Sequence, residues 1–259
     1  MGKYFTVEVK PVIDVAALAA GNILDEEILF DWAAFDVPKG ASKLIGVTIR
    51  YTGKNGVDYT PKDFELFWAK SINNAAPGTL GDDGAAVDTF GWFPNIIGKT
   101  FVDVSNGRND GDLIMGNIIT VGNPGGGTAA KSNEANLVGE NGLVLEGEPD
   151  TGVNVGYDKL YVAAISKEAN HNWGASTMTV NGTMVTTSPI LTVDDLSPVL
   201  SGIGPGDVLR DEDNNLFGTV KSVDSATQIT MEDNLAHASA DDKLVYNTSP
   251  ITLLLSFEK

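Results

Sequence analysis

The segment 125–132, with the sequence GGGTAAKS, is the part of the chain closest to a phosphate-binding loop. Such a loop needs a glycine directly before its lysine and a helix directly after it, because the N-terminal amides of that helix hold the phosphates. Here Ala130 precedes Lys131, and the residues that follow do not predict an amphipathic helix. We interpret the segment as a surface loop and expect no nucleotide cofactor.

The acidic run 211–215 places oxygen atoms at alternate positions, on Asp211, Asp213 and Asn215. Hard cations such as Ca²⁺ prefer oxygen ligands, so a weak metal site is one interpretation of this run. However, the run lacks the glycine and the distal glutamate of a twelve-residue calcium loop. It also lies between two predicted strands, where a hairpin needs a polar turn, and we favour the turn.

Residues for other kinds of catalysis are sparse. The chain has no cysteine, and its two histidines, His171 and His237, lie far apart in the sequence, so a local two-histidine zinc motif is excluded. No Gly-x-Ser-x-Gly elbow of a serine hydrolase occurs. The 35 acidic residues make chance carboxylate pairs unavoidable, and no pair has a context that distinguishes it. We expect a protein that is not an enzyme and has no cofactor.

Aromatic residues are the remaining functional candidates. Phe90, Trp92 and Phe93 lie in a glycine-flanked segment, and Trp173 lies close to a break in the strand pattern. Such rings stack on sugars or anchor protein interfaces, where tryptophan and tyrosine are enriched. Packing in the core is the alternative, because tryptophan is strongly buried on average.

The charge of the chain limits its partners. The formal net charge is −18, and nucleic-acid binding needs lysine and arginine to displace counterions. We therefore expect neither a nucleic acid nor an anionic membrane as partner. The N-terminal residues do not resemble a signal peptide, and no apolar run is long enough to span a membrane, so synthesis in a cytoplasm is expected.

Alternation of apolar and polar residues with a period of two dominates the chain and predicts β-strands. The clearest alternation is in the segments 4–10, 45–51 and 251–257. In the second of these, the pattern places Ile45 on the same face as Val47 and Ile49. Helical signals are short and few. The sequence therefore predicts an all-β protein.

Turn signals and a break in the pattern at 170–174 divide this all-β chain. We predict an N-terminal antiparallel β-sandwich, jelly-roll-like, over residues 1–173, and a smaller C-terminal β-barrel or sandwich over residues 174–259. The boundary is placed near Gly174, before the hairpin signal Asn181-Gly182.

The C-terminal third resembles a small β-module that recurs in virion proteins of tailed bacteriophages. The resemblance is carried by the segments GDVLRD at 206–211, NLFGTVKSV at 215–223 and TQITM at 227–231. In the N-terminal part, FDW at 30–32 before VPKG at 37–40 resembles capsid decoration or cement proteins of marine and cyanobacterial phages.

This resemblance implies a structural protein on the capsid exterior of a virion. The implied partner is the major capsid protein or another virion subunit, and the implied state is a homo-oligomer, with a trimer favoured. We expect partner contacts at the N-terminal strand, at the loops 78–91 and 122–132, and at an interface formed by Tyr4, Phe5, Val7, Trp92, Phe93 and Trp173. The alternative is a carbohydrate-binding or adhesin module of a tail fibre or cell surface, with the tryptophans as stacking platforms.

Overall fold

The computed structural model describes residues 3–15, 28–52, 63–87, 90–102, 116–121, 143–149, 155–167, 178–194 and 203–259. Among them, strands dominate, and no helix is long and apolar enough to cross a membrane. The elements are β1 (Tyr4–Val9), β2 (Ile28–Pro38), β3 (Ser42–Thr52), β4 (Phe64–Lys70), the 3-10 helix η1 (Phe93–Asn95), β5 (Ile96–Val102), β6 (Gly116–Val121), β7 (Leu143–Leu145), β8 (Glu148–Pro149), β9 (Tyr157–Ser166), β10 (Ile190–Thr192), β11 (Val208–Asp211), β12 (Leu216–Ser225), β13 (Gln228–Met231), β14 (Val245–Asn247) and β15 (Ile251–Glu258).

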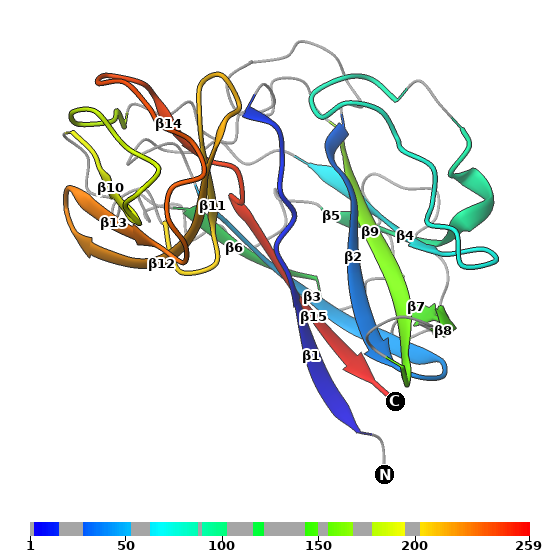
Figure 1. The fold of residues 1–259 in the computed structure, drawn as a ribbon. Helices are drawn as coiled ribbons and strands as arrows, with labels where there is room; N and C mark the ends of the chain where they lie inside the picture. The colour runs from blue at the N-terminus through cyan, green and yellow to red at the C-terminus, as the bar shows by residue number, and fades with distance from the viewer. Residues whose placement is uncertain are drawn as a thin grey trace.

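Two antiparallel sheets form a sandwich (Figure 1). Sheet 1 has the order β1-β15-β3-β6, with the short β7 beside β3, and sheet 2 has the order β2-β9-β4-β5, with the short β8 beside β9. If the eight long strands are numbered along the chain, the orders become 1-8-3-6 and 2-7-4-5. This is the pattern of a long hairpin that pairs 1 with 8, 2 with 7, 3 with 6 and 4 with 5 and is then rolled up. The predicted jelly-roll-like sandwich is confirmed.

The core lies between the two sheets, and β15 contributes to its centre. Its alternation turns Leu253, Leu255 and Phe257 inward, and all three are buried. Phe257 stacks on Phe5 of β1 with a centroid distance of 5.2 Å and also contacts Phe35 of sheet 2 at 6.4 Å. Burying a side chain of this size stabilises the fold by about 1.5–3 kcal/mol. The last strand therefore joins both layers.

One local prediction was wrong. In the pairing of β3 with β15, the register shifts so that Leu44 lies opposite Phe257 while Gly46 lies opposite Ser256. Ile45 is the extra residue of a β-bulge, and Leu44 instead of Ile45 shares the inward face with Val47. A bulge inserts one residue and so reverses the alternation on one side of it.

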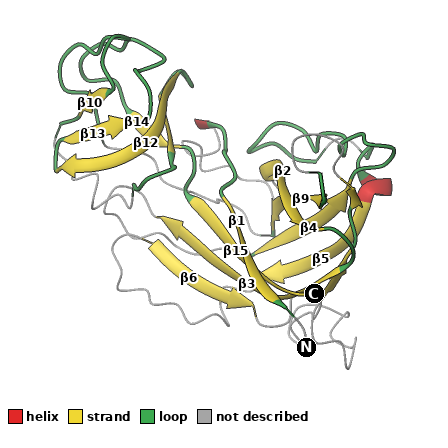
Figure 2. Cartoon of the chain, turned by 60° about the horizontal axis from the view of Figure 1, so that its bottom comes forward, coloured by secondary structure: helices red, strands yellow, loops and turns green. Residues whose placement is uncertain are grey.

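The strands β10 to β14 form a third sheet, with the order β10-β13-β12-β11-β14, set apart from the sandwich (Figure 2). Single β-bridges join Thr179 to Leu244 and Val180 to Val193, so the segment 178–180 approaches both edges of this sheet. Among the described residues the ladder itself stays open, so the predicted C-terminal barrel is not closed. Its own core includes Leu209, Phe217 and further residues of all five strands.

The predicted assignment of the last strand to a C-terminal unit, 174–259, needs correction. β15 lies between β1 and β3 of sheet 1, so the third sheet is inserted between the seventh and eighth strands of the jelly roll. We call the inserted part, residues 178–249, the inserted module. The sequence placed β15 with the module because the two are adjacent in the chain, whereas pairing in the sheet brings β15 back to the N-terminus. The boundary at Gly174 lies outside the described residues.

This topology predicts how pieces of the chain behave. A fragment of residues 1–173 should remain unfolded, because it lacks the central strand of sheet 1. A variant in which a flexible linker of about ten residues replaces residues 168–249 keeps all eight strands and should unfold cooperatively. Circular dichroism and urea denaturation check both. A folded 1–173 fragment together with an unfolded linked variant would instead indicate two domains in succession.

Candidate partner-binding surfaces

The strand β1 forms one edge of sheet 1, with β15 as its neighbour among the described strands. Lys3 and Lys259 exchange both backbone hydrogen bonds, at 3.2 and 2.9 Å, so the odd-numbered residues of β1 bond to β15. The N–H and C=O groups of Tyr4, Thr6 and Glu8 then point away from the sheet. These are the groups that can pair with an added strand.

The side chains of β1 also alternate between two environments, the core and the solvent. Phe5 and Val7 are partly buried and pack against the core, while Tyr4 is 70% exposed and donates a hydrogen bond to Glu258. Of the three β1 residues expected at an interface, only Tyr4 thus presents its side chain to solvent. Phe5 and Val7 support a strand whose outer backbone edge has no partner strand in the part of the chain that the structure describes.

The strand β2 forms the corresponding edge of sheet 2. A groove of about 390 Å³ lies between the two edges, lined by residues 8–12 and 31–34. Trp32 in this groove donates its indole N–H to the Gly78 carbonyl at 2.8 Å. Register shifts in β2 between Ile28 and Ala33 interrupt regular pairing near the groove. The two edges together make an extended, partly polar surface.

The aromatic segment around η1 lies on the outer face of sheet 2. Trp92 is only 5% exposed and packs between Trp32 and Phe67, with centroid distances of 6.3 and 6.0 Å. Phe90 and Phe93 flank it and are 73% and 66% exposed. Burial of both faces prevents Trp92 from stacking on a sugar, so the exposed rings here are the two phenylalanines.

Several predicted features lie outside the described residues. These are Trp173, His171 and the segment 122–132. The loop 78–91 is described except for residues 88–89. Their roles remain predictions.

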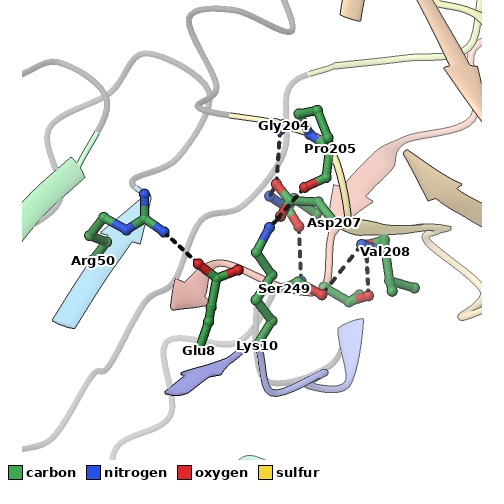
Figure 3. Close-up of polar contacts among 10 residues, drawn as sticks. Glu8, Lys10, Arg50, Gly204, Pro205, Asp207, Val208 and Ser249 are labelled. Carbon is green, nitrogen blue, oxygen red and sulfur yellow. Dashed lines mark hydrogen bonds and ion pairs between the residues drawn. The ribbon is translucent and has the colours of Figure 1, made fainter. Parts of the chain in front are cut away.

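The inserted module is held against the end of β1 by Lys10 (Figure 3). The Lys10 ammonium donates hydrogen bonds to the Pro205 carbonyl at 2.9 Å and to Asp207 Oδ1 at 3.0 Å. Asp207 is buried, and its Oδ2 accepts from Gly204 N and Asn247 Nδ2, each at 3.0 Å. The sequence analysis missed this contact, because the two residues are 197 positions apart and the segment GDVLRD, which contains Asp207, gives no indication of a partner near Lys10.

The acidic run 211–215 forms the turn between β11 and β12. Asp211 is buried, its Oδ1 accepts from the backbone N–H groups of Asp213 and Asn215, and its Oδ2 accepts from Asn215 Nδ2. Asp213 instead pairs with Lys243 at 2.9 Å. The carboxylates of Asp211 and Asp213 are thus directed to protein donors, and the Asn215 side chain serves as one of these donors, as in a hairpin turn.

The segment that follows Lys10 also contacts Asp83, a carboxylate whose pKa is raised. Asp83 Oδ2 accepts a hydrogen bond from Asp14 N at 2.9 Å, and Asp14 accepts one from Asn214 of the inserted module. Burial, and to a smaller degree the charges of Asp14 and Asp31, raise the pKa of Asp83 to about 6. The sequence around Asp83, a Gly-Asp-Asp-Gly turn at 81–84, is typical of a solvated loop tip and gives no sign of this burial, because the environment of Asp83 is built by three separate segments.

Neither protein families nor curated protein sequences provide a template for these surfaces. The chain matches no protein-family model and no curated protein sequence. The partners of these surfaces are therefore inferred from their own chemistry: backbone hydrogen-bonding groups along β1, and exposed rings beside η1.

The two ion pairs at the end of β1 should differ in their contributions to stability. Lys10→Met leaves the buried Asp207 without its cation and should lower the free energy of unfolding by about 1–3 kcal/mol. Glu8→Gln is the matched control. The Glu8–Arg50 pair, at 3.3 Å, is about half exposed, so its loss should change the free energy of unfolding by less than about 0.5 kcal/mol. Urea denaturation measures both. Equal losses in the two variants would show that Lys10 does not anchor the module.

The raised pKa of Asp83 predicts a pH dependence. The folded state holds the proton more tightly than the unfolded state, so its contribution is complete below about pH 4 and is lost as the pH rises through about 6. Asp83→Asn should therefore stabilise the protein by about 1–3 kcal/mol at pH 7.5 and leave it almost unchanged at pH 4. Thermal unfolding of both proteins at the two pH values checks this. A variant that is less stable at pH 7.5 would contradict it.

Proposed function

We propose that this protein is a non-enzymatic structural subunit of a virion: a decoration or cement protein on the exterior of a tailed-bacteriophage capsid. In this role it binds the major capsid protein lattice as a homo-oligomer, with a trimer as the expected state. The observation that carries the proposal is the pair of neighbouring sheet edges, β1 and β2, with a groove between them.

Edge strands favour such a role because their outward N–H and C=O groups bind an extended segment by strand addition. The jelly roll supports the proposal by analogy, since it recurs in viral capsid domains, although the same fold also serves lectins and other proteins. The resemblance of segments 206–231 to a phage virion module points in the same direction. The net charge of −18 keeps free copies soluble and apart before assembly.

The two exposed phenylalanines provide a second contact region. Phe90 and Phe93 project from a segment that is anchored on sheet 2 by Trp92, so their position is fixed by the fold. Exposed aromatic side chains on a rigid base are typical anchors of protein interfaces. Capsid proteins with apolar pockets are suitable partners for them.

A substitution on the free edge of β1 tests the proposal. Thr6→Pro removes an outward N–H group but no hydrogen bond to β15, whereas Thr6→Val changes the same side chain and keeps the N–H. In co-sedimentation with capsid shells that lack this protein, we expect Thr6→Pro to weaken binding by at least about tenfold and Thr6→Val to bind as the wild type does.

Other outcomes are equally informative. Unchanged binding by a folded Thr6→Pro variant would remove β1 from the interface. If the wild-type protein does not sediment with the shells, and a glycan array shows saturable binding that Phe93→Ala abolishes, the protein is a carbohydrate-binding module instead. Light scattering after size-exclusion chromatography measures the oligomeric state, and a monomer at micromolar concentration would contradict the expected trimer.

A further inference from the structure

Two buried oxygen atoms that face the interior at one end of the jelly roll have no hydrogen-bond donor or acceptor among the described residues; a third such atom, Asp36 Oδ1, is on a residue that alternates with the core residue Val37 and so faces away from the interior. They are Oδ1 of Asp158, a residue that is 3% exposed, and Oγ of Ser42, a residue that is 1% exposed. Buried polar atoms are almost always paired with protein, water or an ion, because an unpaired one costs about 1–3 kcal/mol. Two such atoms in one region require a common explanation.

Both side chains point into the space between the sheets. Asp158 pairs with Val37 and lies two residues before Leu160, and both of these neighbours belong to the core. Ser42 pairs with Leu145 and lies two residues before Leu44, which are also core residues. Residues opposite each other, or two apart in a strand, share a face. Asp158 and Ser42 therefore face the same interior, from opposite sheets.

The chain also crosses between the sheets at this end, where the β2–β3 turn and the short strands β7 and β8 lie together (Figure 1). In the β2–β3 turn, Gly40 N donates to Asp158 Oδ2 at 2.6 Å. In the β7–β8 crossing, a Cβ atom on Gly147 would lie 2.7 Å from the Lys159 carbonyl oxygen and 3.2 Å from Asp158 Cβ. The two crossings thus enclose the carboxylate, and only glycine fits at 147.

The charge of Asp158 distinguishes between possible occupants of this space. Within the described part of the chain, no lysine or arginine lies within 4.0 Å of its carboxylate, and the backbone N–H of Gly40 is its sole hydrogen-bond donor. A water molecule would satisfy a hydrogen bond but would leave a buried negative charge uncompensated. A cation between Asp158 Oδ1 and Ser42 Oγ would satisfy both oxygen atoms and also neutralise the charge.

We propose that the space between Asp158 and Ser42 is a binding site for a hard divalent cation of the Ca²⁺ type. Carboxylate and hydroxyl oxygens are ligands for hard cations, and no histidine or cysteine lies among the residues named at this end. Ca²⁺ suits the site better than Mg²⁺ because Ca²⁺ accepts irregular geometry and a variable set of oxygen ligands, whereas Mg²⁺ demands near-ideal octahedral geometry. The ion would tie sheet 1 to sheet 2 where the core ends.

A cluster of three aspartates on the inserted module is the alternative location for a bound cation. Carboxylate oxygens of Asp194, Asp241 and Asp242 lie within 4.8 Å of one another, but Asp241 and Asp242 are exposed and Gly182 N already donates to Asp241. Exposed acidic groups are common without an ion, so this cluster by itself indicates no site. Asp241→Asn therefore serves as the matched control for Asp158→Asn.

Thermal unfolding of the full-length protein in EDTA and in excess CaCl₂ tests the proposal. We expect Ca²⁺ to raise the melting temperature of the wild type by about 5 °C, with a smaller rise in MgCl₂. The Ca²⁺ rise should persist in Asp241→Asn and vanish in Asp158→Asn, and Asp158→Asn should melt no lower than the wild type in EDTA. Ser42→Ala should reduce the rise.

Several results would overturn the proposal. These are a wild type that does not respond to Ca²⁺, a response that survives in Asp158→Asn, and a response that is lost in Asp241→Asn. If Asp158→Asn fails to fold, calorimetric titration with CaCl₂ decides instead. We expect the titration to show one tight Ca²⁺ site in the wild type and in Asp241→Asn. In Ser42→Ala, the affinity of this site for Ca²⁺ should be weaker by about tenfold or more. Equal binding by Ser42→Ala and the wild type would reject the site.

Discussion

The pairing of the last strand with the first and the third is the constraint on which this structure depends. β15 supplies hydrogen bonds to β1 on one side and to β3 on the other, and without it β1 has no described neighbour in sheet 1. Its inward residues fill the middle of the sandwich, and Phe257 contacts aromatic rings of both sheets. The jelly roll is complete only when the end of the chain has returned to its beginning.

The inserted module has to fit into this arrangement without disturbing it. Its ends leave β9 and enter β15, and it is fastened to the segment after β1 by Lys10 with Asp207 and by a hydrogen bond from Ile13 N to the Thr248 carbonyl. In this acidic chain, buried carboxylates take part in the contacts that hold the module together and attach it to the sandwich. Asp207 takes part in the contact with Lys10, and Asp211 organises the turn between β11 and β12; both are buried, and both accept hydrogen bonds from several donors. Asp158 differs, and this difference is the basis for a cation at the other end of the sandwich.

Much of the fold could be predicted from local patterns, and the failures have physical causes. Alternation predicted the strands containing Val7, Ile49 and Leu253, because one face of each is buried. It could not show the bulge at Ile45, which depends on the partner strand. It could not show that β15 leaves the module either, because strand order is set by pairing between distant segments and not by composition.

The candidate surfaces were predictable to a similar degree. The strand at 4–9 was predicted from alternation, and its role in binding stays a prediction; the topology adds that, among the described residues, its outer backbone edge has no partner strand, while Phe5 and Val7 pack against the core. The aromatic segment was also located, yet the burial of Trp92 arises from contacts with Trp32 and Phe67 on other strands. Lys10 and Asp158 carried no sequence signal, and the turn that contains Asp83 gave no sign of its burial, since each of the three residues acquires its role from neighbours far away in the chain.

Native-state hydrogen exchange tests the central role of β15 most directly. If β15 completes the jelly roll, the amides of residues 251–258 open together with those of β3 and β9, with the same free energy and the same dependence on denaturant. The amides of β11 to β13 then form a separate group. Exchange of β15 together with the inserted module, while β3 and β9 stay protected, would contradict this account.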